Sequence, residues 1–112
     1  MPQVHYLACD LKDDPALIEK YKEYHAPGNA WPEITHSIKS AGITDMEIFL
    51  AGNRLFMIMT TTDDFDPAAK AAADAGNPKV QEWETLMDTF QQRLPFAAEG
   101  VKWVPLERIF KL

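Results

Sequence analysis

The chain has 112 residues, of which 46% are hydrophobic and 25% charged, and its formal net charge is −6. This length predicts one domain over residues 1–112, and the composition is that of a globular protein. The negative charge, without clusters of Lys or Arg, argues against nucleic acid and anionic membranes as partners. Cys9 is the only cysteine, which favours a reducing compartment, and we expect a cytoplasmic protein because no stretch predicts a membrane span.

The first half of the chain predicts a strand, two helices and a hairpin. An acidic residue directly before a proline, as in Asp14-Pro15, is typical of a helix start, and Gly42 is a typical helix end. In chain order we expect a strand over residues 4–11, helices over residues 15–28 and 32–42, and paired strands over residues 46–50 and 55–61.

The second half predicts two more helices and a strand. Asp66-Pro67 begins an alanine-rich helix that Gly76 ends. Asn77-Pro78 then begins another helix, whose apolar residues keep a helical spacing as far as Leu94. They are Val80, Trp83, Met87, Phe90 and Leu94. The tail from residue 101 to 112 is rich in β-formers, and Pro105 predicts an edge strand or a bulge there.

These elements together predict an α+β fold of the ferredoxin-like type. If each broken helix counts as one crossover, the order is βαββαβ. Helices then cover one face of the sheet, and the other face needs a cover because Met57, Met59 and nearby aromatic residues make a bare sheet unfavourable. We expect a second copy to supply it, as a homodimer that forms a dimeric α/β barrel.

The residue pair Tyr21 and His25 is the first candidate for chemistry. The two lie four positions apart in a predicted helix, so their side chains share one face, and His25 precedes an irregular loop. Imidazole titrates near neutral pH, which suits proton transfer. The pattern alone also fits a surface or capping histidine.

Two tryptophans are candidates for binding. Trp31 before Pro32 fits a hydrophobic contact that fixes the entry to a helix, and Trp83 lies on an apolar helical stripe, so both also fit structural roles. An indole face with its polar N–H edge equally suits the C–H face of a sugar.

The sequence predicts neither a metal site nor a nucleotide cofactor. The three histidines, His5, His25 and His36, lack the short spacing of metal ligands. Gly-rich phosphate loops and a nucleophile elbow are also lacking.

The run from Tyr21 to Glu33, YKEYHAPGNAWPE, resembles the Y-x-x-x-H…WPE signature of the L-rhamnose mutarotases. The similarity continues through residues 37–59, residues 80–87 and the tail LERIFKL. Two positions depart from the family pattern: the segment between His25 and Trp31 is two residues longer, and Glu84 stands where a second tryptophan is usual.

The resemblance implies a dimeric enzyme that interconverts the α and β anomers of a 6-deoxy-L-hexose without a cofactor. It implies His25 as the acid/base and Tyr21 as its partner, with Trp31 and Trp83 at the sugar. An apolar wall for the C6 methyl group would come from Met57 or Met59. Because some members of the family act on L-fucose, both L-fucose and L-rhamnose stay open as the monosaccharide substrate.

Two alternatives share the predicted fold. One is a monooxygenase-like enzyme of the dimeric α/β barrels, and the other is a non-enzymatic dimeric module that binds a ligand. Fold alone does not separate them from a mutarotase.

Overall fold

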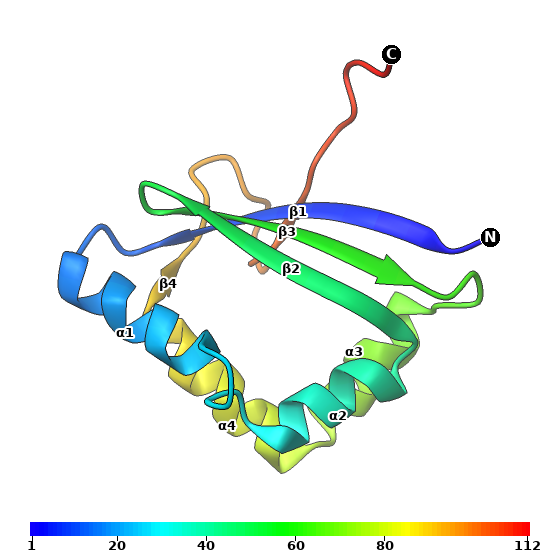
Figure 1. Ribbon diagram of the computed structural model, residues 1–112, viewed down its shortest axis with the longest axis horizontal. Helices are drawn as coiled ribbons and strands as arrows, with labels where there is room; N and C mark the ends of the chain where they lie inside the picture. The colour runs from blue at the N-terminus through cyan, green and yellow to red at the C-terminus, as the bar shows by residue number, and fades with distance from the viewer.

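The computed structural model describes all residues, 1–112, as an antiparallel sheet with four helices on one of its faces (Figure 1). The elements are β1 (Gln3–Leu11), α1 (Pro15–His25), α2 (Pro32–Ser40), β2 (Ile43–Ala51), β3 (Arg54–Thr61), α3 (Pro67–Ala75), α4 (Pro78–Asp88), β4 (Gln91–Gln92) and β5 (Val104–Pro105). The strand order is β2-β3-β1-β4, and β5 pairs with β1 beside β4. β4 and β5 both pair with the edge of β1 opposite β3, and together they take the place of the last strand in the βαββαβ order. The sheet therefore has the predicted ferredoxin-like α+β arrangement.

The helices begin where the sequence predicts. Each has proline in its first turn, and three of them begin after a side-chain cap in which Asp14, Asp66 or Asn77 accepts hydrogen bonds from two backbone N–H groups. These bonds satisfy donors that have no partner within the helix. Gly42 follows α2 with φ of +96°, and a Cβ there would lie 2.9 Å from Thr62 Oγ1. A glycine is therefore needed at this turn into β2.

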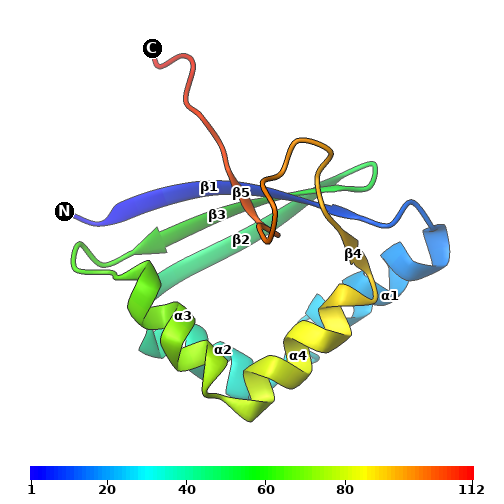
Figure 2. The ribbon, with the colours of Figure 1, turned by 180° about the vertical axis from the view of Figure 1, so that it is seen from behind.

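The register places alternate residues of the three long strands on opposite faces. On the helix side the opposed pairs are Met46 with Met59, Ile48 with Met57 and Leu50 with Leu55. The prediction that Met57 and Met59 belong to the face without helices was therefore wrong, because the strand alternation turns both toward the helices. The fully buried side chains include Leu11 and Leu55, which pack against aromatic residues of α1 and α4. The core therefore lies between the sheet and the helices, and no helix covers the other face (Figure 2).

Two predictions for the C-terminal third were wrong. The fourth helix ends at Asp88 rather than Leu94, because Phe90 O accepts a hydrogen bond from Lys12 N at 2.8 Å and Gln91 and Gln92 pair with β1. Phe90 and Leu94 are nevertheless buried. Instead of a strand from 101 to 112, the tail pairs with β1 only through the two-residue β5 and a bond from Leu106 N to Tyr6 O. The edge position predicted from Pro105 is correct, because β5 pairs with β1 alone.

The last residues leave the sheet on the side away from the helices (Figure 1). Ile109 and Phe110 are 89% and 77% exposed. None of the four helices combines the length and the apolar character that a membrane crossing requires.

Candidate active site

A cavity of about 330 Å³ lies between the helices and the covered face of the sheet. Its walls are mostly apolar, and the sheet contributes Leu7, Met46, Ile48, Met57 and Met59. Ligand sites commonly measure about 300–1,000 Å³, so this one suits a small molecule. A larger groove of about 660 Å³ between α2 and α3 is open and polar, and it contains neither Tyr21 nor His25.

His25 lies at the end of α1 and lines the cavity. Its Nδ1 is 2.8 Å from the backbone carbonyl oxygen of Tyr21. A carbonyl only accepts hydrogen bonds, so this contact places a proton on Nδ1. In the neutral ring, Nε2 therefore carries the lone pair and is the nitrogen that can accept a proton.

Two aromatic rings hold the imidazole in place. The Tyr21 ring stacks on it, with centroids 4.2 Å apart and planes 28° apart, and Trp83 meets it nearly edge-on at 5.5 Å. Burial by these neighbours lowers the pKa of His25, while the hydrogen bond with Tyr21 O acts in the opposite direction. His25 is therefore mainly neutral near pH 7 and available as a base.

Tyr21 is 4% exposed and lines the same cavity. Burial raises its pKa well above the usual range, and the side chain of Gln91 partly opposes this effect. The phenol therefore keeps its proton at neutral pH, and its hydroxyl can donate a hydrogen bond. His25 is oriented by the carbonyl and the ring of Tyr21.

The other predicted site residues separate into two groups. Trp83, Met57 and Met59 line the cavity together with Tyr21 and His25. Trp31 does not line it, because its ring packs against Trp83 with centroids 5.0 Å apart and borders a shallow outer depression. We therefore find Trp31 behind Trp83, where it supports that indole.

The cavity also contains polar residues that the sequence analysis did not place there. They are Glu84 in α4, Gln91 in β4 and Lys102 in the segment before β5, together with Thr35 and Ser37 of α2 and Lys70 and Asp74 of α3. The missing tryptophan at position 84 marked one of them, whereas Gln91 was assigned to a helix and Lys102 carried no local signal. No group of three or more His, Cys, Asp and Glu side chains is arranged to hold a metal ion.

Fold and site together define a small ferredoxin-like protein with acid–base groups in an aromatic-walled cavity. A family model described as L-rhamnose mutarotase matches residues 5–112. The chain therefore belongs to the L-rhamnose mutarotase family.

Similarity to individual proteins agrees with this assignment. The chain is 53% identical over 103 residues to an L-fucose mutarotase of Xanthomonas campestris pv. campestris, and the aligned region covers 92% of this chain and 82% of the relative. It is 39% identical over 109 residues to a UPF0734 protein of Dictyostelium discoideum, covering 94% and 86%.

The crystal structure of an L-rhamnose mutarotase from Formosa agariphila superposes with a TM-score of 0.69 over 98% of both chains, at 24% identity. At that identity the match supports the fold, and the predicted ferredoxin-like class is confirmed. The family assignment confirms the predicted activity class, an isomerase of the mutarotase type, and does not favour the monooxygenase or the non-enzymatic module.

Proposed function

We propose that this mutarotase acts on L-fucose and that His25 transfers the proton. The observation that carries the proposal is the neutral His25 ring, fixed by Tyr21 with Nε2 free to accept a proton inside a cavity of monosaccharide size. The 53% identity to an L-fucose mutarotase favours L-fucose over L-rhamnose.

The reaction needs only proton transfers. His25 Nε2 removes the proton of the anomeric hydroxyl, the C1–O5 bond breaks as the C1 carbonyl forms, and O5 receives the proton. Rotation about C1–C2 presents the other face of the carbonyl, and the reverse steps close the ring as the other anomer. One group of suitable pKa suffices, and general acid–base catalysis contributes about 10²–10⁴-fold.

The neighbours of His25 have separate roles in this proposal. The Tyr21 hydroxyl donates a hydrogen bond to the oxygen that gains charge, since the phenol remains protonated. Trp83 stacks on the C–H face of the ring, with Trp31 packed behind it. Met57 and Met59 supply an apolar wall for the C6 methyl group. No cofactor or metal takes part.

We also propose that two copies pair through the uncovered face of the sheet. This face and the tail expose large apolar side chains that a lone soluble domain rarely leaves in water. They include Val4 at 48%, Tyr6 at 45%, Phe49 at 50% and Leu106 at 44%. A second copy is the occupant that matches such a face to itself by two-fold symmetry.

Cys9 is a free and fully buried thiol, which suits a reducing compartment. We therefore propose that the enzyme works in the cytoplasm.

Saturation-transfer NMR at anomeric equilibrium tests the proposed activity. One anomeric proton of L-fucose is saturated, and the loss of signal from the other anomer gives the exchange rate. We expect the protein to accelerate exchange of L-fucose, and of L-rhamnose to a smaller extent. If neither sugar exchanges faster with the protein than in buffer, the proposed substrate class is wrong.

A further inference from the structure

Three polar side chains of the cavity have no role in the proposed proton transfer. They come from different elements and are Glu84, Gln91 and Lys102. A 6-deoxyhexose that occupies the cavity buries hydroxyl groups besides the anomeric one. Each hydroxyl that lost water without a new hydrogen bond would cost about 1–3 kcal/mol, so these groups need partners.

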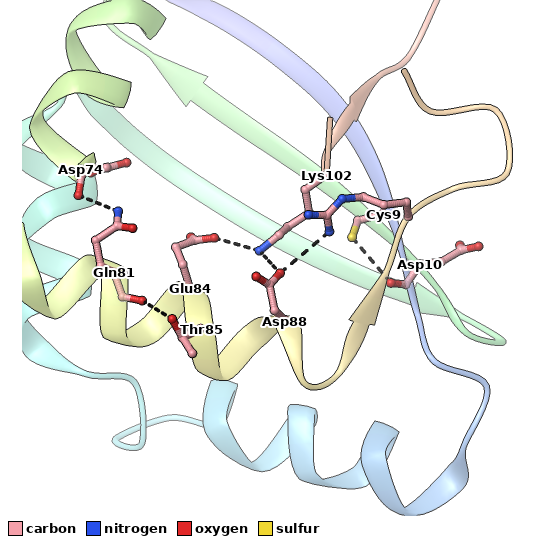
Figure 3. A network of polar contacts seen from close by, with 9 residues as sticks. Cys9, Asp10, Asp74, Gln81, Glu84, Thr85, Asp88 and Lys102 are labelled. Carbon is pink, nitrogen blue, oxygen red and sulfur yellow. Dashed lines mark hydrogen bonds and ion pairs between the residues drawn. The ribbon is translucent and has the colours of Figure 1, made fainter. Parts of the chain in front are cut away.

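Lys102 is held by two carboxylates of α4 (Figure 3). Its Nζ lies 2.8 Å from Glu84 Oε2 and 2.8 Å from Asp88 Oδ1, and its side chain is only 15% exposed. Burial acts to lower the pKa of Lys102, but the bonds with Asp88 and Glu84 outweigh it, and the pKa lies above its ordinary value. The ammonium group is therefore charged and fixed in position.

This arrangement leaves hydrogen-bonding capacity at the cavity wall, where Lys102 is 15% and Glu84 50% exposed. An ammonium group has three N–H donors, and the two carboxylates account for two of them. Glu84 uses only Oε2, so its Oε1 is free to accept. Asp88 holds Lys102 without lining the cavity and also lies 3.8 Å from Arg93. The free donor and the free acceptor therefore belong to Lys102 and Glu84.

Gln91 adds an independent sign that the cavity takes a ligand. The residue is 6% exposed, and its Oε1 is a buried side-chain oxygen without a hydrogen-bond partner. Such an oxygen costs about 1–3 kcal/mol. A donor from a bound molecule would remove that cost after a small rotation of the amide.

A second lysine of the cavity is less suited to this role. Lys70 is paired with Asp74 one turn away in α3, and Asp74 also accepts a hydrogen bond from Ser37. Both Lys70 and Asp74 border the open groove between α2 and α3 as well as the cavity. Ser37 donates to Asp74 Oδ1 and Lys70 to Asp74 Oδ2, so this carboxylate has no free oxygen for a ligand.

We propose that Lys102 and Glu84 bind two neighbouring ring hydroxyls of the sugar and so select among deoxyhexose stereoisomers. Gln91 Oε1 accepts a hydrogen bond from a further hydroxyl. The proposal rests on the proposed sugar substrate. Lys102 donates a hydrogen bond to one hydroxyl oxygen, and Glu84 Oε1 accepts a hydrogen bond from the next hydroxyl. A sugar in which one of these hydroxyls points the other way loses the bond made by that hydroxyl, which gives discrimination that an apolar wall does not provide.

The test compares Lys102→Met and Glu84→Gln with the unaltered protein in the NMR exchange assay over a range of L-fucose concentrations. Each variant removes one charged partner, so we expect the half-saturating concentration to rise about tenfold or more. The maximal exchange rate should stay within about threefold, because these residues do not touch the transferred proton. Lys22→Met is the matched control, since Lys22 also pairs with a glutamate but lies outside the cavity.

Deoxy sugars locate the contact. With the unaltered protein, removal of one of two neighbouring hydroxyls should weaken binding about tenfold, and the same removal should have little further effect in Glu84→Gln. Half-saturation within twofold of the unaltered protein in the folded variants, or equal binding of all the deoxy sugars, would overturn the proposal. If Lys102→Met does not fold, Glu84→Gln and the deoxy series decide. An unaltered protein that accelerates no exchange refutes the proposed substrate instead.

Discussion

Both faces of the sheet carry large apolar side chains, but the faces differ in what lies over them. On the helix side, Leu55 is 2% exposed and Met57 9%. On the other side, Phe49 is 50% exposed although its strand neighbour Leu50 points into the covered layer. The alternation of side chains along a strand thus separates a face that the helices cover from one that no helix covers.

This difference separates chemistry from assembly. His25, Tyr21 and Trp83 all approach the sheet from the helix layer, so one copy contains the whole cavity. The open face contains no residue of that cavity among its exposed apolar side chains. Changes on the covered side should therefore alter catalysis or stability, and changes on the open side should alter association.

The largest effect should follow from His25→Ala. The variant lacks the nitrogen that carries the proton, so L-fucose exchange should fall about 10²–10⁴-fold toward the rate in buffer. The free energy of unfolding should change by less than about 1 kcal/mol, because the side chain lies at the cavity rim. NMR exchange and urea unfolding measure the two quantities. His36→Ala, an exposed histidine of α2, is the matched control. A large loss of stability with little loss of exchange would make His25 structural.

Leu55→Ala should cost the most stability. This side chain is buried in the cluster between β3, α1 and α4, and its truncation leaves a cavity worth about 2–5 kcal/mol. Urea unfolding followed by circular dichroism measures the loss. Phe49→Ala at low protein concentration is the paired variant for the open face. If it cost as much as Leu55→Ala in a monomeric sample, the contrast between the faces would be wrong.

Phe49→Ser should weaken the proposed dimer. Half of this residue is already buried within one copy, so its replacement removes roughly 1–2 kcal/mol of association free energy per copy. Both copies of a two-fold dimer carry the change, so the total loss is twice that amount. That corresponds to a dissociation constant about 30- to 1,000-fold higher, which sedimentation can measure. Lys22→Ser on α1 is the control. L-fucose exchange per chain should stay within about threefold, and its collapse would show that the cavity needs the partner.

Local signals explain which parts of this structure the sequence could predict. Asp14, Asp66 and Asn77 act within three residues of themselves, so the helix starts follow from neighbouring letters. Tyr21 and His25 are similarly linked by one helical turn.

The incorrect and missing predictions concern distant partners. The spacing of Phe90 and Leu94 continues the helical stripe, yet Gln91 and Gln92 pair with β1 through backbone hydrogen bonds that no local pattern encodes. Lys102 meets Glu84 from 18 residues away, with the end of α4, β4 and a loop between them. The polar residues of the cavity therefore come together only once the chain is folded.

The smallest effect concerns pH and follows from the environment of His25. Burial lowers its pKa below the ordinary value of about 6.5, so the neutral base persists to lower pH than in an exposed histidine. The catalysed exchange rate should stay level near neutrality and fall only when the pH drops through the lowered pKa. Between that pKa and about 6.5, the unfolded chain binds more protons than the folded one. The contribution of His25 to the free energy of unfolding therefore decreases as the pH falls through this window and is constant above it.

NMR titration of the His25 ring and exchange rates from pH 5 to 8, each corrected for the rate in buffer, check both trends. Phe49→Ser should give the same profile, because the open face does not touch the imidazole, whereas His36→Ala tests for other titrating histidines. An exchange midpoint at or above about 6.5 would mean that the stacked rings do not desolvate the base. The residues around His25 would then orient its ring without lowering its pKa.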